Sequence, residues 1–421
     1  MRKQSTRDIR RSNQLSVLKS IYATGSISRQ QIAEETGLST ATVANVVTDL
    51  LNYGIVIESG FEESQGGRPR AILTAHTTNG YLVGIDVAET YIHFDLFDLG
   101  LNLCHATQHA LNSAENRPAQ IAAHITNGLD ELLEQPRVPQ EKVLGVGVSM
   151  PGPVDPRSGV SIFAPNWGWH DVPLLAMLKE QIDLRIYLDN PLKALALAEL
   201  WFGSGRGAAN LVAVNLGTGV GAGVVVDGAL YRGASNCAGE WGHTNIAIDG
   251  WECRCGSHGC VEAYIGAPGI IRMIREIAPQ SSLLQQDDQT ATITALADAL
   301  HRDDPVARQV LGEAVRYLGP AIANLINMFN PQVVVIGGWV SDKLGAYLLP
   351  ELNRVVPRYV LRRALEATTI QICQLRYNPV SVGAATFALT GFLSSAERGT
   401  AIAGLINPSS SVASTPTAAQ S

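Results

Sequence analysis

The sequence predicts an α/β protein preceded by an N-terminal winged helix-turn-helix domain. Residues 9–75 have the pattern of three helices followed by a short hairpin. From about residue 80 onward, apolar strands alternate with helices, which is the order typical of an α/β fold. The 421 residues are enough for two or three domains. We expect a DNA-binding domain over residues 1–78, an α/β domain over 79–393 and a disordered polar tail over 394–421.

The composition excludes several classes of protein. The chain is 46% apolar and 16% charged, which is ordinary for a globular protein and unlike a disordered or collagenous one. No uninterrupted apolar run approaches the roughly 18 residues that span a bilayer. The first eleven residues are basic but no apolar segment follows them, so they do not form a secretory signal. These features predict a cytoplasmic protein without membrane insertion.

Charge is distributed unevenly along the chain. The net charge is −7, yet residues 1–75 carry nine Lys or Arg against seven Asp or Glu, and the remainder carries 22 against 31. A small basic end on a larger acidic body favours contact with nucleic acid. Basic tails are also common on proteins that do not bind nucleic acid, so the charge alone does not decide the question.

The second and third predicted helices form a helix-turn-helix pattern. Ser28 can cap the second helix, and Gln31 completes the capping box three residues later. Gly37 breaks the chain before a third helix that opens at residues 38–40. In that third helix, the apolar positions repeat at helical spacing and must face inward. They are Val43, Val46, Val47 and Leu50.

The outer face of the third helix carries Thr40, Thr42 and Asn45. Short donors and acceptors of this kind suit a helix that enters the major groove and contacts base edges. The alternative is an ordinary helical hairpin with a solvated face. A predicted hairpin over residues 55–58 and 71–73 favours the winged domain, because its tip carries Arg68 and Arg70. Arginine at a wing tip can enter a narrow minor groove.

The second region contains strands and helices in alternation. We expect strands over residues 81–87, 91–97, 143–149, 211–216, 220–226 and 332–336. We expect helices over residues 119–133, 192–202, 268–277, 292–299 and 306–329. In such a fold, the loops that follow the strands line a ligand cleft.

Four residues in this region have the spacing of a metal site. They follow the pattern H-x9-C-x-C-x4-C and are His243, Cys253, Cys255 and Cys260. In a reducing compartment, clustered cysteines indicate a metal rather than a disulfide. One imidazole and three thiolates make a closed tetrahedral set that favours Zn²⁺. No ligand position remains for water, so we expect a structural zinc ion rather than a hydrolytic one.

Several segments resemble the ROK family (repressors, open reading frames, kinases). The most specific are Gly-Glu-Trp-Gly-His at residues 239–243 and the cysteine segment at 253–262. The resemblance extends to residues 150–155, 216–221 and 335–338, and it covers roughly residues 80–392. It implies a two-lobed actin/hexokinase-like fold with a sugar in the cleft. Within the family, the chain resembles the sugar-responsive repressors of xylose, N-acetylglucosamine and glucose metabolism.

The resemblance also implies a set of sugar-binding residues. They are Gly152, Asn190, Glu240, His243 and Glu262. Carboxylate and amide groups in a dry cleft suit sugar hydroxyls, because each hydroxyl must exchange water for a good partner. For Glu240 and Glu262, the alternative is that they are solvated surface carboxylates.

Two departures from the family pattern bear on catalysis. The kinases of this family carry the motif Asp-x-Gly-Gly-Thr in their first phosphate loop. In the corresponding segment, this chain has Ala88 and Glu89 in place of the two glycines. The family's catalytic Asp precedes a helical Glu by eight residues, and counting back from Glu199 gives Pro191. Proline cannot act as a general base. We therefore expect no catalytic residues and no kinase activity.

The resemblance and its departures together predict a transcriptional regulator. We expect a repressor of carbohydrate-utilisation genes that leaves double-stranded operator DNA when a monosaccharide or sugar phosphate binds. A homodimer or a dimer of dimers would match a two-fold operator. One alternative is an active ATP-dependent sugar kinase with an accessory DNA-binding domain. Another is a regulator that is sequestered by a protein partner and binds no sugar.

Overall fold

The computed structural model describes residues 6–61, 69–112, 116–134, 137–164, 167–284 and 288–396. The chain divides into two compact units. One comprises the residues up to Asn79 together with those from Leu393 onward, and the other is Gly80–Phe392. Within the described ranges, no helix combines the length and apolarity that crossing a membrane requires.

The N-terminal unit is a winged helix-turn-helix. Its elements are α1 (Thr6–Thr24), β1 (Ile27–Ser28), α2 (Arg29–Thr36), α3 (Thr40–Asn52), β2 (Val56–Phe61) and β3 (Ala71–Ala75). The strands form an antiparallel sheet in the order β1-β3-β2, and β2 and β3 make the wing. The predicted helices and hairpin are confirmed. Residues 62–68 of the wing lie outside the described residues, and Arg68 is among them.

Local signals in the sequence account for the helix boundaries of this unit. Ser28 and Gln31 form the predicted capping box at the start of α2. Gly37 ends α2 in a left-handed conformation (φ 68°), which glycine adopts without steric cost. Ser39 caps α3 by accepting from the backbone N–H of Thr42. The four apolar positions predicted to face inward on α3 are all buried.

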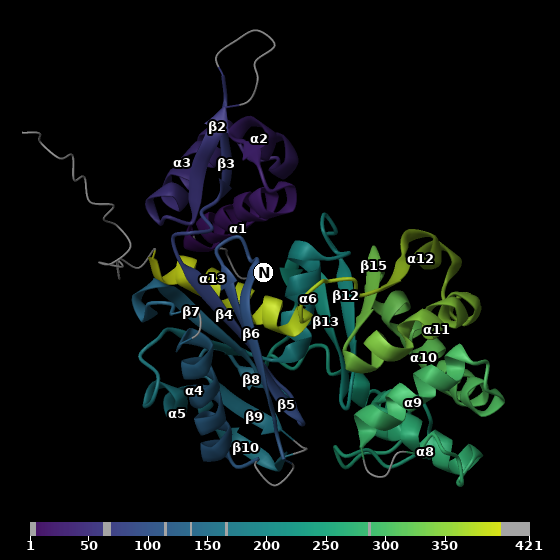
Figure 1. Cartoon of the computed structure of the whole chain (residues 1–421). Helices are drawn as coiled ribbons and strands as arrows, with labels where there is room; N and C mark the ends of the chain where they lie inside the picture. The colour runs from purple at the N-terminus through teal and green to yellow at the C-terminus, as the bar shows by residue number, and fades with distance from the viewer. Residues whose placement is uncertain are drawn as a thin grey trace, which may run out of the picture. The chain divides into compact units, whose positions relative to one another are not determined.

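The larger unit contains two five-stranded sheets, which define two lobes (Figure 1). The first lobe has the sheet order β11-β7-β4-β5-β6, and the second has the order β14-β13-β12-β15-β16. The strands of the first lobe are β4 (Tyr81–Val87), β5 (Tyr91–Asp98), β6 (Leu103–Ala110), β7 (Val143–Ser149) and β11 (Ile186–Asp189). The strands of the second lobe are β12 (Leu211–Leu216), β13 (Val220–Val226), β14 (Ala229–Leu230), β15 (Val333–Gly337) and β16 (Thr369–Ile372). The sequence-predicted strands are present, and β6, β11, β14 and β16 are additions.

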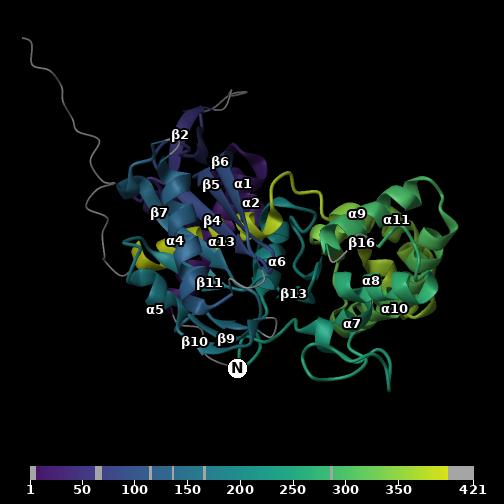
Figure 2. The same cartoon turned by 60° about the horizontal axis from the view of Figure 1, so that its bottom comes forward.

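Helices cover both faces of these sheets. In the first lobe α4 (Pro118–Glu134) lies against β5 and β6, close to α5 (Leu174–Lys179). A small antiparallel sheet follows β7, made of β8 (Val154–Asp155), β9 (Val160–Ala164) and β10 (Trp169–Val172). The helices of the second lobe are α7 (Val261–Ile265), α8 (Ala267–Ile277), α9 (Gln289–His301), α10 (Pro305–Phe329), α11 (Trp339–Val355) and α12 (Arg362–Ala367). Figure 2 shows this group of helices beside the second sheet.

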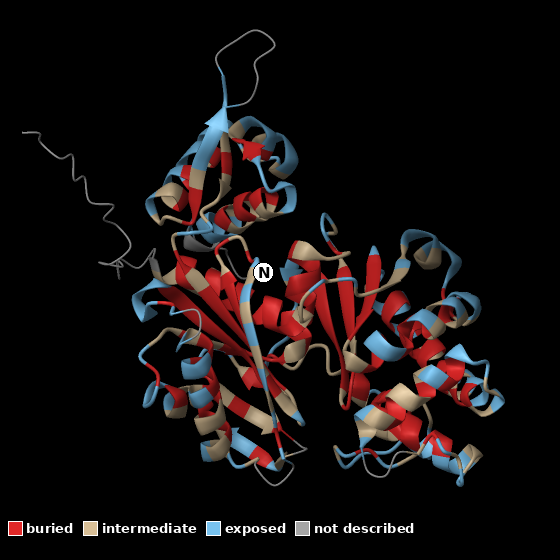
Figure 3. Cartoon of the chain, viewed as in Figure 1, coloured by how far each residue is buried: buried red, intermediate tan, exposed pale blue. Residues whose placement is uncertain are grey.

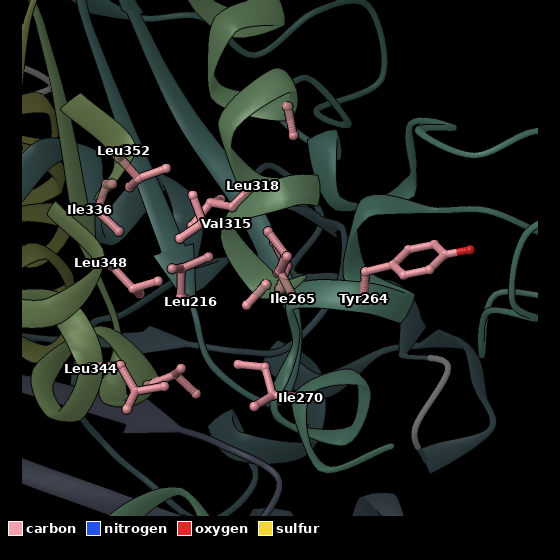
Figure 4. Packing of buried hydrophobic residues seen from close by; sticks show 14 of the residues in the cluster. Leu216, Tyr264, Ile265, Ile270, Val315, Leu318, Ile336, Leu344, Leu348 and Leu352 are labelled. Carbon is pink, nitrogen blue, oxygen red and sulfur yellow. The ribbon is translucent and has the colours of Figure 1, made fainter. Parts of the chain in front are cut away.

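The core of the second lobe lies between its sheet and its long helices. Leu216 and Ile336 from the sheet face Val315 and Leu318 of α10 and Leu348 of α11 in one buried cluster (Figure 4). Burial colouring shows the inner strands of both sheets as continuously buried (Figure 3). Strands covered on both faces read as unbroken apolar runs, and this property made them recognisable in the sequence.

Two helices, α6 (Pro191–Phe202) and α13 (Pro379–Ala396), lie between the two sheets (Figure 1). Gly223 of β13 meets the backbone of α6 at Leu192. Where the two helices cross, Gly383 of α13 lies directly against the carbonyl oxygen of Ala194. The absence of a side chain at Gly383 therefore permits this close approach.

Gly147 of β7 provides a test of the packing of α13 on the first sheet. A Cβ atom at Gly147 would overlap the carbonyl oxygen of Ala384 in α13. We expect Gly147→Ala to lower the free energy of unfolding by about 3 kcal/mol, because a buried backbone must move to accept the methyl group. Urea unfolding of the full chain measures the change.

Gly312 in α10 supplies the matched control for this substitution. It lies inside the helix, and a Cβ atom added there would have no neighbour within 4 Å. Gly312→Ala should leave stability unchanged or raise it by about 0.5–1 kcal/mol, since alanine is the better helix former. Equal stability of both variants would mean that α13 does not pack on Gly147 as described.

Candidate functional site

A cavity of about 350 Å³ opens where the parallel strands of the two lobes end. The loops that follow β4, β7, β11, β12 and β15 all contribute to its wall. Ligand sites at the carboxyl ends of parallel strands are general in α/β folds. The five sugar-binding residues that the family resemblance implies line this one cavity: Gly152, Asn190, Glu240, His243 and Glu262.

Gly152 allows two backbone segments of this wall to lie close together, its own and that of Phe163. Its φ is +77°, and a Cβ atom there would overlap the carbonyl oxygen of Phe163. Both observations require glycine at this position.

The two polar atoms of the Asn190 side chain have different roles, since Oδ1 caps a helix and Nδ2 has no partner among the described residues. It is the N-cap of α6, and its Oδ1 accepts from the backbone N–H of Lys193 at 3.1 Å. The residue is 1% exposed, and its Nδ2 has no hydrogen-bond partner among the described residues. A buried donor without a partner costs about 1–3 kcal/mol. A ligand hydroxyl in the cavity could remove that cost.

Two glutamates face the same cavity from the second lobe. Glu262 is nearly buried, and its Oε2 accepts from the backbone N–H of Val220 at 2.9 Å. Oε1 of Glu240 is buried without a partner among the described residues. Burial raises the pKa of Glu240, and the nearby Lys193 and His243 oppose that rise. Neither glutamate is therefore the solvated surface carboxylate of the alternative interpretation.

The four predicted metal ligands lie close together in the structure. One donor atom from each of His243, Cys253, Cys255 and Cys260 lies within 4.8 Å of the other three. His243 Nδ1 is 3.7 Å from Cys253 Sγ, and the Sγ atoms of Cys255 and Cys260 are 3.8 Å apart. Vertices of a tetrahedron with bonds of about 2.3 Å are separated by about 3.8 Å, and these two pairs match that separation. The structure thus places a candidate metal centre beside the cavity.

Ionisation of the thiols in this cluster needs a nearby positive charge. Burial raises the pKa of Cys253 and Cys260, which disfavours the thiolate form. A divalent cation would stabilise the thiolates and displace those protons. His243 faces the thiols through Nδ1, which leaves Nε2 for the cavity that this residue lines. Glu262 follows Cys260 by two residues, so the metal loop also sets the position of this carboxylate.

Arg254 joins the metal loop to both lobes, which the sequence did not predict. It lies between two cysteines of the cluster, and its Nη1 is 3.3 Å from Oε2 of Glu89 in the first lobe. Its Nη2 donates to the carbonyl oxygen of Thr218 at 3.1 Å and lies 3.6 Å from Oε1 of Glu262. Burial raises the pKa of Glu89, and the Arg254 guanidinium opposes that rise.

The cavity wall also holds Asp86, Asn378 and Asp342. Asp86 at the end of β4 accepts from the Tyr91 hydroxyl at 3.1 Å and from Asn378 Nδ2 at 3.0 Å. Asp342, in the first turn of α11, also lines the cavity, and burial raises its pKa. Asp86 and Asn378 are 292 positions apart, and no local motif links them.

The predicted DNA-contacting residues lie on the N-terminal unit. Thr40 and Asn45 are exposed on α3, whereas the hydroxyl of Thr42 lies 2.8 Å from that of Ser39 and supports the cap. Arg70 is exposed and lines a groove of about 710 Å³ together with Thr40 and Arg29, which was not among the predicted DNA contacts. Arg68 falls outside the described residues.

Comparison with known proteins decides the family. A model described as ROK family matches residues 82–390, which is more than half of the chain. The chain belongs to the ROK family. A second model, described as winged helix-turn-helix DNA-binding, matches residues 10–57. The resemblance and the fold class inferred from the sequence are therefore confirmed.

Relatives within the ROK family include both repressors and kinases. The xylose repressor of Caldicellulosiruptor bescii is 30% identical over 386 residues, covering 91% of this chain and 96% of the relative. A glucokinase of Halalkalibacterium halodurans is 34% identical over 301 residues, covering 70% of this chain and 91% of the relative. The crystal structure of a ROK family transcriptional regulator, a homologue of the E. coli MLC protein, matches with a TM-score of 0.75. It is 24% identical and covers 92% of this chain and 97% of that one, which supports the fold.

Proposed function

We propose that this chain is a sugar-responsive transcriptional repressor whose winged domain binds operator DNA and whose ROK cleft binds the effector. The observation that carries the sugar part is the pair of buried, unpartnered polar atoms in the cavity, Asn190 Nδ2 and Glu240 Oε1. A ligand hydroxyl in the cavity would satisfy both atoms. The full-length similarity to the xylose repressor, which includes the winged domain, supports the DNA-binding part.

Pro191 and Asp189 argue against phosphoryl transfer. Pro191 is the first residue of α6. By the family resemblance, it stands where the family's kinases have their catalytic Asp. The neighbouring Asp189 does not line the cavity and is 2% exposed. Its carboxylate accepts from Arg232 and from the backbone N–H of Asn190 at 2.9 Å, so it is not available as a general base.

The first phosphate loop supports the same proposal. Ala88 donates its backbone N–H to Tyr91, which closes a tight turn between β4 and β5. Glu89 occupies this turn and faces the cavity. A carboxylate at that point would repel nucleotide phosphates. We therefore propose that the glucokinase-like fold is retained here for binding and not for catalysis.

We further propose that the metal is a structural Zn²⁺ ion. Its ligands would be His243, Cys253, Cys255 and Cys260, whose donor atoms all lie within 4.8 Å of one another. The bound ion would supply a fixed loop geometry and stabilise the thiolates. This chain's own residues then act on the sugar: His243 would offer Nε2, and Glu262 would be held in place by the loop.

The winged domain would contact the operator through α3 and the wing. We propose Thr40, Thr42 and Asn45 for base contacts and Arg68 and Arg70 for the minor groove. One such domain makes few contacts, so a homodimer on a two-fold site is expected. The sugar acts by favouring one arrangement of the dimer. A tenfold loss of operator affinity requires about 1.4 kcal/mol of such preference.

Asn45→Ala tests the recognition helix. We expect a loss of operator affinity of tenfold to a hundredfold, because one specific base contact contributes about 1–3 kcal/mol. Sugar affinity should not change. Fluorescence anisotropy with labelled operator measures the effect, and Thr78→Ala, an exposed residue after the wing, is the control. Unchanged DNA affinity in Asn45→Ala would exclude this face of α3 as the reading surface.

A gel shift on the protein's own upstream DNA tests the function as a whole. The shift should disappear as one member of a monosaccharide panel is titrated in. A parallel assay with ATP and the same sugars should give no phosphorylated product. Steady ATP-dependent phosphorylation would instead establish the kinase alternative, and operator binding without any sugar response would favour control by a protein partner.

A further inference from the structure

The cavity wall carries a strong excess of negative charge. Five carboxylates line it: Asp86, Glu89, Glu240, Glu262 and Asp342. No Lys or Arg is found among the described residues of the wall. Burial raises the pKa of Asp86, Glu89, Glu240 and Asp342. An anion that entered this space would either meet these charges or force further protonation, and both outcomes cost free energy.

Cations near the cavity do not reverse this excess. Arg254 is shared between Glu89 and Glu262. Lys193 is 1% exposed, is not among the lining residues, and donates to the carbonyl oxygen of Ala238 at 2.8 Å. A divalent ion held by three thiolates and one neutral imidazole leaves the metal centre with a net charge of about −1.

Helix N-termini could still attract an anion, and those of the three longer helices α6, α11 and α13 reach the cavity. At α6, Asn190 Oδ1 caps the backbone and Pro191 has no N–H to offer. At α13, Asn378 Oδ1 accepts from Val380 at 2.9 Å and from Ser381 at 3.2 Å, and Pro379 again lacks an N–H. These two helix ends are therefore occupied by the chain's own side chains.

The third helix end, that of α11, carries its own negative charge. Asp342 lies in the first turn of α11 and lines the cavity. A carboxylate there offsets the positive end of the helix dipole. None of the three helix ends therefore offers an open site for phosphate.

We propose that the effector of this cavity is an unphosphorylated sugar, and that Glu89 and Asp342 are specificity residues that exclude phosphate esters. The inference rests on the proposed function and narrows it, since the family resemblance alone leaves both sugars and sugar phosphates open. Glu89 acts in two ways. It adds a charge to the wall, and it engages the guanidinium of Arg254, which would otherwise be able to pair with a phosphate.

Calorimetric titration of the full chain tests this proposal. The probes are D-glucose, D-xylose and N-acetyl-D-glucosamine, with glucose 6-phosphate and N-acetylglucosamine 6-phosphate as the charged partners. A free sugar should bind at least about tenfold more tightly than its ester. An ester that binds as tightly as its free sugar would overturn the inference and leave the proposed function standing. If neither free sugars nor esters bind, the proposed function fails as well.

Charge-neutralising variants identify the residues responsible. Glu89→Gln should strengthen binding of the ester at least about threefold relative to the free sugar, because it releases Arg254. Asp342→Asn should also reduce the preference for the free sugar over its ester. Asp342 is more exposed than Glu89, so this variant replaces Glu89→Gln as the test if that variant does not fold. Asp130→Asn on the exposed face of α4 is the matched control and should leave the ratio unchanged. An unaltered ratio in both test variants would remove these two residues from the proposal.

Discussion

Replacing Cys255 by serine is expected to release the metal ion and abolish sugar binding. Cys255 Sγ lies 3.8 Å from Cys260 Sγ in the four-residue cluster, and Cys255 also borders the cavity. Serine is a poor zinc ligand because its hydroxyl stays protonated at neutral pH. Loss of the ion would free the loop that carries His243 and positions Glu262. We expect metal content to fall from one ion per chain to nearly none.

Metal analysis by mass spectrometry and calorimetry with the effector sugar measure both effects. A structural zinc ion contributes folding free energy directly, so the unfolding temperature should fall as well. Cys104→Ser is the control, because Cys104 is exposed on β6 and outside the cluster. Retention of a full equivalent of zinc by Cys255→Ser would show that this thiol is not a ligand.

Asn190→Ser is expected to weaken sugar binding tenfold to a hundredfold with little loss of stability. Serine is as good an N-cap as asparagine, so α6 should keep its first turn. The unpartnered Nδ2 disappears, however, and with it the hydrogen bond that a sugar hydroxyl would accept. A buried hydrogen bond of this kind contributes about 1.5–3 kcal/mol, counting the cost of the unsatisfied group.

Calorimetry and urea unfolding together separate the two roles of Asn190. The exposed Asn127 on α4 provides the matched control, and Asn127→Ser should change neither quantity. If Asn190→Ser instead lowers stability strongly and leaves sugar affinity intact, the residue is a cap alone. The sugar would then depend on Glu240 and Glu262.

The sequence predicted the elements that have local signals. The capping box at Ser28 and the break at Gly37 locate α2, and the apolar runs locate the buried strands. Helix α13 was missed because small and apolar residues occupy it on every side. It packs between the two lobes and has no polar face, so no helical period appears in its sequence. Strand β6, at a sheet edge, alternates only between half-buried and exposed positions.

In the candidate site, too, some residues have a local sequence signal and others do not. The metal ligands lie within 18 residues and could be identified by spacing, and the family resemblance supplied the cavity residues. The contact between Glu89 and Arg254 joins positions 165 residues apart. Asp86 and Asn378 are 292 apart. Such pairs form only when the tertiary fold brings the two lobes to one cavity. A single sequence has no local pattern that indicates which distant residues come into contact.

The contact between Gly383 and Ala194 sets how closely α6 and α13 can approach each other. A Cβ atom at Gly383 would overlap the backbone of Ala194. Any larger residue would therefore hold these two helices, and the sheets on which they pack, farther apart. The separation of the two lobes thus depends on one missing methyl group.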